Sequence, residues 1–238
     1  MLALLNTSGF TIASVSSAVS VYVEGVDFYG GNRNMTLDRR DGGTVDFYAH
    51  RVGMFHATGP TSGRSDNLVA AGARDVFLQE CAVKFSNKDG ANYARSNIAF
   101  VEMESPRVIE LDCDMGHNGL GQSTDLSCNA STGHTGAKII RVGGTYQDTM
   151  GGVVCDVHTD TQSINAGITV RDSQTGLNET RGSLISAGQG VESWVFGGNA
   201  YQGGTVDVYA EADSAVRGAG LWHFTDGGPG TLDLDLIV

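Results

Sequence analysis

The chain has 238 residues and a formal net charge of −12, with 34 glycines beside only 3 prolines. So acidic a surface repels phosphate backbones, which excludes nucleic acid as an expected partner, and a hydrophobic content of 40% excludes general disorder. No segment approaches the ~20 consecutive apolar residues of a membrane-spanning helix, so no membrane partner is expected either.

Residues 1–20 contain the apolar segment MLALL and a Ser/Thr-rich stretch. We expect them to form an N-terminal cap or a first strand. The first basic residue is Arg33, so the charged start of a signal peptide is absent. The expected location is therefore a virion, or the extracellular space reached without a leader.

Residues 21–228 repeat one pattern, in which an apolar, strand-like segment ends in glycine. Successive glycines are 24 to 33 residues apart, at Gly31, Gly59, Gly90, Gly119, Gly152, Gly176, Gly204 and Gly228. Further strand-like segments lie between them: NIAFVEM, GVVCDVH, GSLISAG and TVDVYAE. A repeat of ~28 residues fits three short strands joined by turns, and no amphipathic helical period is present. The segments TVDFYAH and TVDVYAE are near copies, which we interpret as the self-similarity of stacked repeats.

These glycine-ended repeats, together with DGANYARSNIAFVEMESPRVIELDCDMGHNG, resemble the right-handed parallel β-helix superfamily of pectate-lyase-like proteins and phage tail spikes. The resemblance covers nearly the whole chain but carries no complete catalytic motif of one family. It implies an all-β, right-handed parallel β-helix (a solenoid) of about eight coils over residues 21–228. It also implies a polysaccharide as the partner.

Residues 229–238 are expected to form a C-terminal strand or cap. They end in TLDLDLIV, an apolar strand-like segment without a polar tail. Such a strand either closes the last coil or pairs within a homo-oligomer. Because tail-spike β-helices form trimers, the resemblance favours a homotrimer.

The four cysteines are expected to act as small buried hydrophobic residues, since three of them lie in apolar strand-like runs. They are Cys81, Cys113, Cys128 and Cys155. A disulfide between stacked repeats is the alternative, because neighbouring strands would bring two of these cysteines close together. None of them has zinc-site spacing.

Aligning the repeats on their final glycines predicts an outward row of polar residues. The row consists of Asp114, Gln147, Arg171, Asn199 and His223, and the first three repeats place Val26, Met54 and Phe85 in the same row. Neighbouring positions would lie ~4.8 Å apart.

Asp148 and Asp172 follow the row by one residue, and Asp112 shares a strand face with Asp114. Glycoside hydrolysis needs two carboxyl groups ~5 Å or ~6.5–9.5 Å apart, and neighbouring carboxylates raise one pKa, which supplies an acid. The candidate catalytic residues are therefore Asp112, Asp114, Asp148 and Asp172. The alternative is that these aspartates stabilise turns or face solvent.

A polysaccharide lyase would instead need a Lys, Arg, His or Tyr base. The candidates for substrate binding or for this base are Arg171, His117, His134, Tyr146 and Arg141. His134 lies in GQSTDLSCNASTGHTG, which occupies the longest interval between glycines and is expected to be a loop that projects from the stack.

Asp156, His158 and Asp160 alternate along one strand-like segment, CDVHTD. Carboxylate oxygens are hard ligands for a cation such as Ca²⁺ or Mn²⁺, but three ligands on one strand seldom enclose an ion, so we favour the alternative of an exposed polar face. No cofactor is otherwise indicated.

The sequence thus favours a tail-spike-like or adhesin-like β-helical protein that binds, and in one version cleaves, a surface polysaccharide. The first alternative is a free polysaccharide lyase or glycoside hydrolase, a depolymerase. The second is a non-catalytic structural component of a virion.

Overall fold

The computed structural model describes the chain in segments, and all statements below refer to them. The described residues are 2–4, 10–14, 17–31, 34–39, 43–59, 67–71, 73–85, 87–88, 98–101, 107–118, 124–127, 138–150, 154–157, 161–174, 185–187, 190–201, 208–210, 212–221, 226–227 and 230–236. These residues form strands and turns and no helix, so within them no helix is long and apolar enough to cross a membrane.

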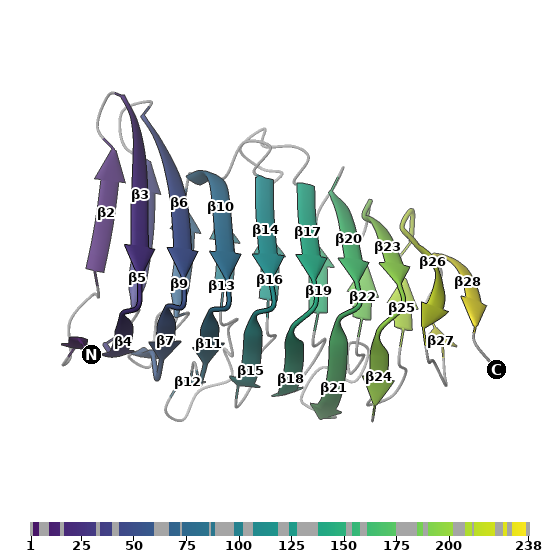
Figure 1. Ribbon diagram of the computed structural model, residues 1–238. Helices are drawn as coiled ribbons and strands as arrows, with labels where there is room; N and C mark the ends of the chain where they lie inside the picture. Colours follow the sequence, from purple (N-terminus) through teal and green to yellow (C-terminus); the bar gives the residue numbers. More distant parts are fainter. Residues whose placement is uncertain are drawn as a thin grey trace.

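Three long sheets contain nearly all of the strands (Figure 1). Sheet A consists of β1 (Leu2–Leu4), β4 (Asp27–Gly30), β7 (Gly53–Phe55), β11 (Ala82–Lys84), β15 (Asp114–Asn118), β18 (Thr145–Met150), β21 (Thr169–Gln174) and β24 (Asn199–Tyr201). Sheet B consists of β2 (Phe10–Ser14), β5 (Met35–Arg39), β9 (Leu68–Ala71), β13 (Ile98–Val101), β16 (Thr124–Ser127), β19 (Val154–Val157), β22 (Ile185–Ala187), β25 (Val208–Ala210) and β27 (Asp226–Gly227). Sheet C consists of β3 (Ala18–Glu24), β6 (Thr44–His50), β10 (Ala73–Gln79), β14 (Arg107–Leu111), β17 (Lys138–Val142), β20 (Gln162–Ala166), β23 (Glu192–Phe196), β26 (Ala215–Leu221) and β28 (Thr231–Leu236). A fourth, two-stranded sheet joins β8 (Thr58–Gly59) and β12 (Asn87–Lys88).

The path of the chain is cyclic. From β2 to β26, apart from β8 and β12, it passes through sheets B, C and A in turn. Each strand of these sheets pairs in parallel with the strand of the same sheet from the preceding cycle. In Figure 1 the strands accordingly form rows that run from the N-terminus to the C-terminus. The fold is therefore all-β with long parallel sheets, consistent with the parallel β-solenoid that the repeat period predicts. The segments NIAFVEM, GVVCDVH, GSLISAG and TVDVYAE all supply strands of sheet B, as strands between the glycine-ended repeats.

A left-handed residue turns the chain from sheet C into sheet A in every cycle. The φ angles lie between 49° and 64° at Gly25, Arg51, Glu80, Asp112, Gly143, Gly167 and Gly197. The amide of each of these residues donates to a carbonyl in the next cycle, as from Asp112 N to Val142 O at 2.9 Å. The backbone hydrogen bonds between strands therefore continue around this corner.

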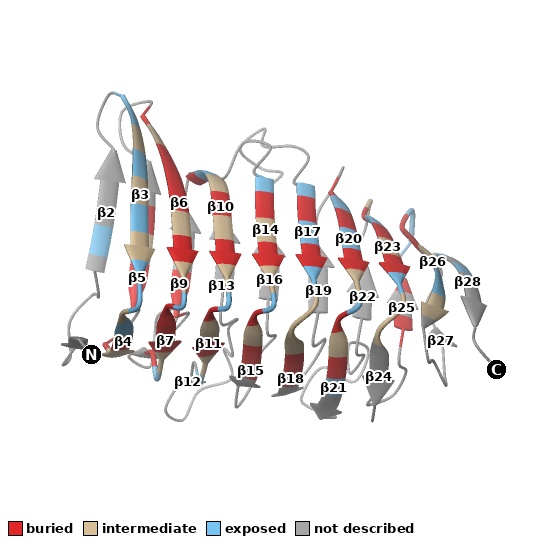
Figure 2. Cartoon of the chain, viewed as in Figure 1, coloured by how far each residue is buried: buried red, intermediate tan, exposed pale blue. Residues whose placement is uncertain are grey.

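The core lies between the three sheets. Buried residues alternate with more exposed ones along strands such as β14 and β17 (Figure 2), so alternate side chains of these strands point inward. Sheet A contributes an inward row in register: Phe28, Met54, Val83, Met115, Tyr146 and Val170. Sheet C contributes Phe47, Val76, Val108 and Ile139, and sheet B contributes Met35, Leu37 and Leu68. Burial of each large apolar side chain contributes about 1.5–3 kcal/mol.

Two sequence predictions need correction. The near copies TVDFYAH and TVDVYAE are not equivalent positions, because Thr44–His50 lies in sheet C whereas Val208–Ala210 lies in sheet B. The stretch after Gly119 is not simply a projecting loop, since Thr124–Ser127 forms β16 and pairs with both β13 and β19. Short, similar strand sequences fit either sheet, so likeness alone does not fix position.

Candidate functional site

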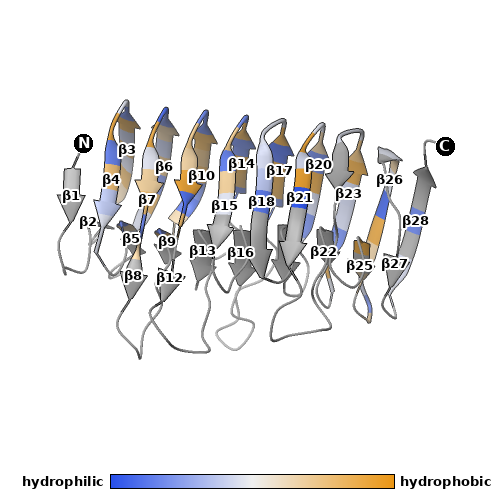
Figure 3. Cartoon of the chain, turned by 90° about the horizontal axis from the view of Figure 1, so that it is seen from below, coloured by the Kyte–Doolittle hydropathy of each residue, from blue (hydrophilic) through white to orange (hydrophobic). Residues whose placement is uncertain are grey.

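The outer face of sheet A carries the residues on which the predicted site depends. Outward positions form two rows in register, of which the first is Asp27, Gly53, Ala82, Asp114, Thr145, Thr169 and Asn199. The second is Tyr29, Phe55, Lys84, Gly116, Gln147, Arg171 and Tyr201. Figure 3 shows this sheet facing the viewer, with its strands side by side.

The predicted row is therefore partly correct. Gln147 and Arg171 are paired positions, as the sequence alignment expects. Asp114 pairs with Thr145 instead of Gln147, and Asn199 pairs with Thr169 instead of Arg171. Each of these errors is two residues, which keeps the side chain on the same face of the strand.

The first three positions of the predicted row are also displaced. Met54 pairs with Phe28 and Val83, so Val26 and Phe85 do not share its row. Met54 is fully buried and points into the core. Of the three residues Val26, Met54 and Phe85, only Met54 thus belongs to the inner face of sheet A, whereas Phe85 is exposed.

Four polar side chains connect across strands β11, β15, β18 and β21. The ammonium of Lys84 contacts Oδ2 of Asp114, and Gln147 Nε2 donates to Asp114 Oδ1 at 3.3 Å. Arg171 Nε donates to Gln147 Oε1 at 2.7 Å. We call Lys84, Asp114, Gln147 and Arg171 the polar ladder. It presents two cations, a carboxylate and an amide along the axis of the stack.

A glycine makes this arrangement possible. Gly116 lies between Lys84 and Gln147 in their row, and its φ of 142° is one that residues with a side chain rarely adopt. A Cβ at this position would lie 1.8 Å from the carbonyl oxygen of Gln147. The absent side chain leaves a gap over which Lys84 and Gln147 both reach the carboxylate of Asp114.

Aromatic side chains continue the outer face of sheet A toward the N-terminus. The rings of Tyr29 and Phe55 lie 4.9 Å apart, and those of His56 and Phe85 are stacked at 4.8 Å. His56 also lies 6.1 Å from Tyr29. The polar ladder is therefore preceded, along the same face, by a cluster of aromatic rings, those of Tyr29, Phe55, His56 and Phe85.

Asp112 is separate from the polar ladder. It is the left-handed corner residue before β15 and is exposed. Its carboxylate lies over the next corner, since a Cβ on Gly143 would be 2.0 Å from Asp112 Oδ1. Aspartate tolerates this backbone conformation better than most residues, which gives Asp112 a turn-forming role.

Tyr146 and Arg141, candidates for substrate binding, point into the interior. Both are fully buried. Tyr146 donates from its hydroxyl to Glu110 Oε2 at 2.7 Å, and Arg141 Nε lies 3.3 Å from the same oxygen. The pKa of Tyr146 is raised well above its ordinary value, mainly because the side chain is buried and secondly because the negative charge of Glu110 is close to it. A polymer on the outer surface would not reach either side chain.

The buried polar network extends toward the C-terminus. Arg141 Nη1 donates to Asn165 Oδ1 at 3.1 Å, and Asn165 Nδ2 donates to Ser193 Oγ at 3.1 Å. Ser163 Oγ lies 2.9 Å from Ser193 Oγ. All four side chains are buried, so the interior here contains hydrogen-bonded polar side chains beside apolar ones such as Val170 and Val195.

The remaining candidates lie wholly or partly outside the described residues. His134, His158 and Asp160 are not in a described segment. His117, Asp148, Asp156 and Asp172 are in described strands, but their side chains are not described. Within the described part of the chain, no group of three or more His, Cys, Asp or Glu side chains could hold a metal ion.

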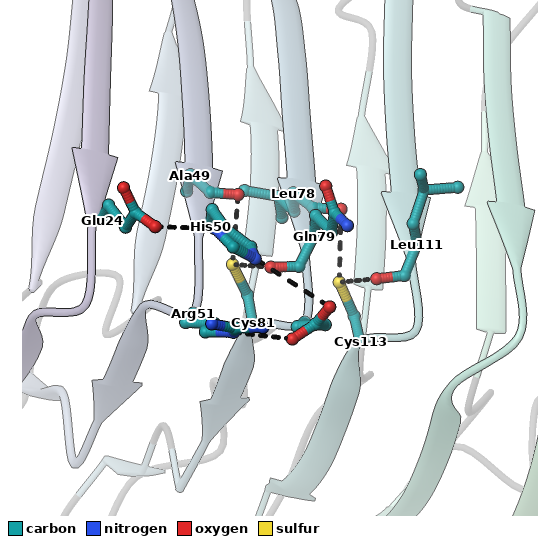
Figure 4. Close-up of polar contacts among 10 residues, drawn as sticks. Glu24, Ala49, His50, Arg51, Leu78, Gln79, Cys81, Leu111 and Cys113 are labelled. Atoms are coloured by element: carbon teal, nitrogen blue, oxygen red, sulfur yellow. Dashed lines mark hydrogen bonds and ion pairs between the residues drawn. The ribbon is translucent and has the colours of Figure 1, made fainter.

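A second polar cluster lies near the corner between sheets C and A (Figure 4). His50 Nδ1 lies 3.0 Å from Glu24 Oε1, and Arg51 Nε donates to Glu80 Oε2 at 2.8 Å. The hydrogen bond from Arg51 holds the pKa of Glu80 below its ordinary value. This exposed cluster links the corners of consecutive cycles.

Cys81 and Cys113 lie behind this corner as free, buried thiols (Figure 4). Their Sγ atoms donate to main-chain carbonyls, including Gln79 O at 3.3 Å and Leu111 O at 3.5 Å. The pKa of the Cys113 thiol is raised, mainly by hydrogen bonding with Cys81 and secondly by burial. The interpretation of these two cysteines as small buried residues agrees with this placement.

Sequence reasoning missed Lys84 and Glu110. Lys84 is one of only three lysines, and it alternates with the buried Val83 in the segment CAVKF. Glu110 occupies an inward position of an alternating strand, two residues from the buried Val108. Strand alternation would have identified both positions, although not their partners.

Comparison of this chain with protein-family models, with curated proteins and with solved structures found no match.

Proposed function

We propose that the chain is a right-handed parallel β-helix of about eight coils that binds a linear surface polysaccharide along the outer face of sheet A. In this proposal it acts as a spike-like or adhesin-like binding protein. The observation that supports the proposal is the polar ladder, which lies in line with the aromatic cluster of Tyr29, Phe55, His56 and Phe85.

The chemistry of this face suits a sugar polymer. Hydroxyl groups both donate and accept hydrogen bonds, and the polar ladder offers cationic donors, an amide and a carboxylate. Sugar rings also have apolar faces that pack on aromatic side chains such as Tyr29 and Phe55. A single sugar polymer can use both the hydrogen bonds to its hydroxyl groups and the packing of its rings on aromatic side chains, and this face offers both kinds of contact.

The geometry suits an extended ligand. Outward rows on sheet A repeat at ~4.8 Å per strand, so the seven strands from β4 to β24 span about 29 Å. A straight row of this length favours a polymer that runs along the stack over a compact small molecule.

Binding without cleavage is the version that the described side chains favour. Both carboxylate oxygens of Asp114 have partners, Lys84 and Gln147, whereas a general acid needs a carboxyl group that can hold and release a proton. Asp112 lies at the corner and contacts Gly143. In this proposal Asp114 therefore holds the polar ladder together and Asp112 forms the corner, and neither acts as a catalytic carboxyl group.

The test is retention on immobilised polysaccharides, in a panel of neutral, carboxylated and sulfated polymers. Arg171→Ala removes the exposed end of the polar ladder and should weaken binding about tenfold, equivalent to ~1.4 kcal/mol. Arg217→Ala on sheet C is the matched control, since Arg217 is a partly exposed arginine 3.8 Å from Glu192. Wild type that binds no polymer, or equal losses in the two variants, would refute the proposal.

The same panel separates a binder from an enzyme. Viscosity and the absorbance of unsaturated products are followed during incubation with each retained polymer. A binding protein leaves both unchanged. Cleavage that Asp114→Asn abolishes would instead favour the lyase or hydrolase alternative.

A further inference from the structure

The outer face of sheet C carries a continuous row of large apolar residues. The pairing of consecutive strands places in register Tyr22, Tyr48, Phe77, Ile109, Ile140, Ile164 and Trp194. A second outward row becomes apolar from β14 onward, with Leu111, Val142, Ala166 and Phe196. Among these, Ile140, Val142, Ile164 and Phe196 are 38–47% exposed, and Tyr22 is 74% exposed.

A face of this kind is unusual for a surface that meets only water. Single exposed apolar residues are ordinary, but contiguous apolar patches on soluble proteins mark interaction sites. In sheet C the two rows are adjacent on strands β14, β17, β20 and β23 and form one patch. Exposed and half-buried residues of these strands alternate with the buried ones in Figure 2.

The charge on this sheet is nearly balanced, although the chain as a whole carries −12. Over the nine strands, the charged residues whose side chains are described and do not point inward are four basic and five acidic: Arg74, Arg107, Lys138, Arg217, Glu24, Asp46, Asp75, Glu192 and Asp233. Most are paired, as Arg74 with Asp46 at 2.6 Å and Arg107 with Asp75 at 2.5 Å. Two copies of an acidic chain repel one another, and that repulsion is weakest where the charge is balanced.

The size of the face is sufficient for a dimer. Nine strands at ~4.8 Å spacing and about five residues at ~3.3 Å per residue give a face of about 38 by 17 Å, or ~650 Å². Two such faces in contact would bury about 1,300 Å², which lies at the lower end of stable, specific interfaces.

The pitch of the face is compatible with a second copy of the chain as its partner. Its side-chain rows repeat at ~4.8 Å along the stack, and two β-sheets pack about 10 Å apart when their side chains interdigitate. A second copy of the same chain presents the same pitch and the same apolar rows. We propose that the outer face of sheet C is a self-association surface, on which a second copy of this chain packs sheet to sheet. The apolar C-terminal segment from which the sequence predicts a homo-oligomer supplies β28 (Thr231–Leu236), the last strand of this same sheet.

The test uses the full chain and a charge-neutral double variant, Ile140→Lys with Ile164→Glu. The two positions are paired neighbours, so the new side chains attract each other and the net charge stays at −12. The matched control is Thr145→Lys with Thr169→Glu, which places the same pair on the outer face of sheet A in the adjoining strands. Circular dichroism confirms that each variant keeps its β-structure.

Mass is measured by light scattering over a range of protein concentrations. We expect the wild type and the Thr145/Thr169 control to have at least twice the chain mass of 24.9 kDa, and the Ile140/Ile164 variant to fall to 24.9 kDa. A monomeric wild type would overturn the proposal, as would an oligomer that survives the sheet C substitutions. Because sheet A is untouched in the Ile140/Ile164 variant, polysaccharide binding can fail or succeed independently of this result.

Discussion

The buried ion pair between Glu110 and Arg141 provides the most demanding test of which side chains face the interior. Both residues are fully buried, on neighbouring strands β14 and β17. Arg141 Nε lies 3.3 Å from Glu110 Oε2, and Tyr146 donates to the same oxygen. Arg141→Met removes one partner and leaves the carboxylate of Glu110 buried without its cation.

The expected cost of Arg141→Met is about 3–5 kcal/mol in the free energy of unfolding, because an uncompensated buried charge is expensive. Glu110→Leu should cost a similar amount, since Arg141 then keeps only neutral partners such as Asn165. The double variant removes both charges and should cost clearly less than either single variant, although it leaves the Tyr146 hydroxyl and Asn165 Oδ1 without these partners. The two substitutions should therefore be strongly non-additive.

Urea denaturation of the four proteins gives these free energies. Lys138→Ser is the control, because Lys138 lies on the same strand but faces outward, is exposed and is not one of the residues of the apolar patch. It should cost less than about 1 kcal/mol. The reverse pattern, with a costly Lys138→Ser and a tolerated Arg141→Met, would mean that strand β17 has its faces exchanged and that Arg141 is available at the surface.

Three further outcomes are expected. Gly116→Ala should lower the free energy of unfolding by about 3 kcal/mol in thermal or urea unfolding, because the new Cβ would lie 1.8 Å from a carbonyl oxygen at a φ of 142°. Gly25→Ala is the control, at a φ of 64° with no atom within 4 Å of the new Cβ, and should cost only about 1 kcal/mol. Equal costs for the two variants would contradict the packing at Gly116. Above about pH 10, Tyr146 should lower the free energy of unfolding by up to ~1.4 kcal/mol per pH unit, since its raised pKa keeps it protonated in the folded state while the same side chain ionises in the unfolded chain. Tyr146→Phe should make this dependence on pH less steep. An unchanged slope in the variant would place the ring in solvent. Cys113 should resist alkylation in the native protein and react after denaturation, because hydrogen bonding and burial raise the pKa of its thiol. Peptide mass mapping measures the extent of alkylation in the two states. Rapid labelling of Cys113 in the native protein would show that the core opens there.

The sequence predicts the class of fold from features that are local. Alternation of apolar and polar residues, β-branched side chains and a repeat of ~28 residues identify the strands, including those of sheet B. Alternation and side-chain type can be read within each strand, and the repeat length can be read along the sequence. They therefore hold without any knowledge of which strands pair.

Register is harder to predict, because it depends on where each cycle is taken to begin. Alignment on glycines such as Gly119 and Gly152 counts residues across connections of unequal length. The corner residues before sheet A form a constant reference: Asp114, Thr145 and Thr169 each lie two residues after their corner, at Asp112, Gly143 and Gly167. Only some corners contain glycine, so their shared left-handed conformation is not visible in the sequence.

The polar interior is also hidden from sequence patterns. A charged residue such as Arg141 ordinarily belongs outside, and its position between Ile140 and Val142 is compatible with either face. What decides the matter is the partner, because Glu110 and Asn165 occupy the neighbouring inward positions of sheet C. Such pairing can be recognised only once the register is known.

The register of sheet A is the claim on which the polar ladder depends, and cysteine cross-linking measures it directly. Arg171 pairs with Tyr201, whereas alignment on the final glycines pairs it with Asn199. Paired positions have Cα atoms ~4.8 Å apart, within the range for a disulfide, while positions displaced by two residues are ~8 Å apart and outside it.

Arg171→Cys with Tyr201→Cys should therefore form a disulfide readily under mild oxidation, and Arg171→Cys with Asn199→Cys should not. Peptide mapping without reduction identifies the linked segments and distinguishes them from the native cysteines. Efficient linkage of position 171 to 199, but not to 201, would contradict the register and the arrangement of the polar ladder with it.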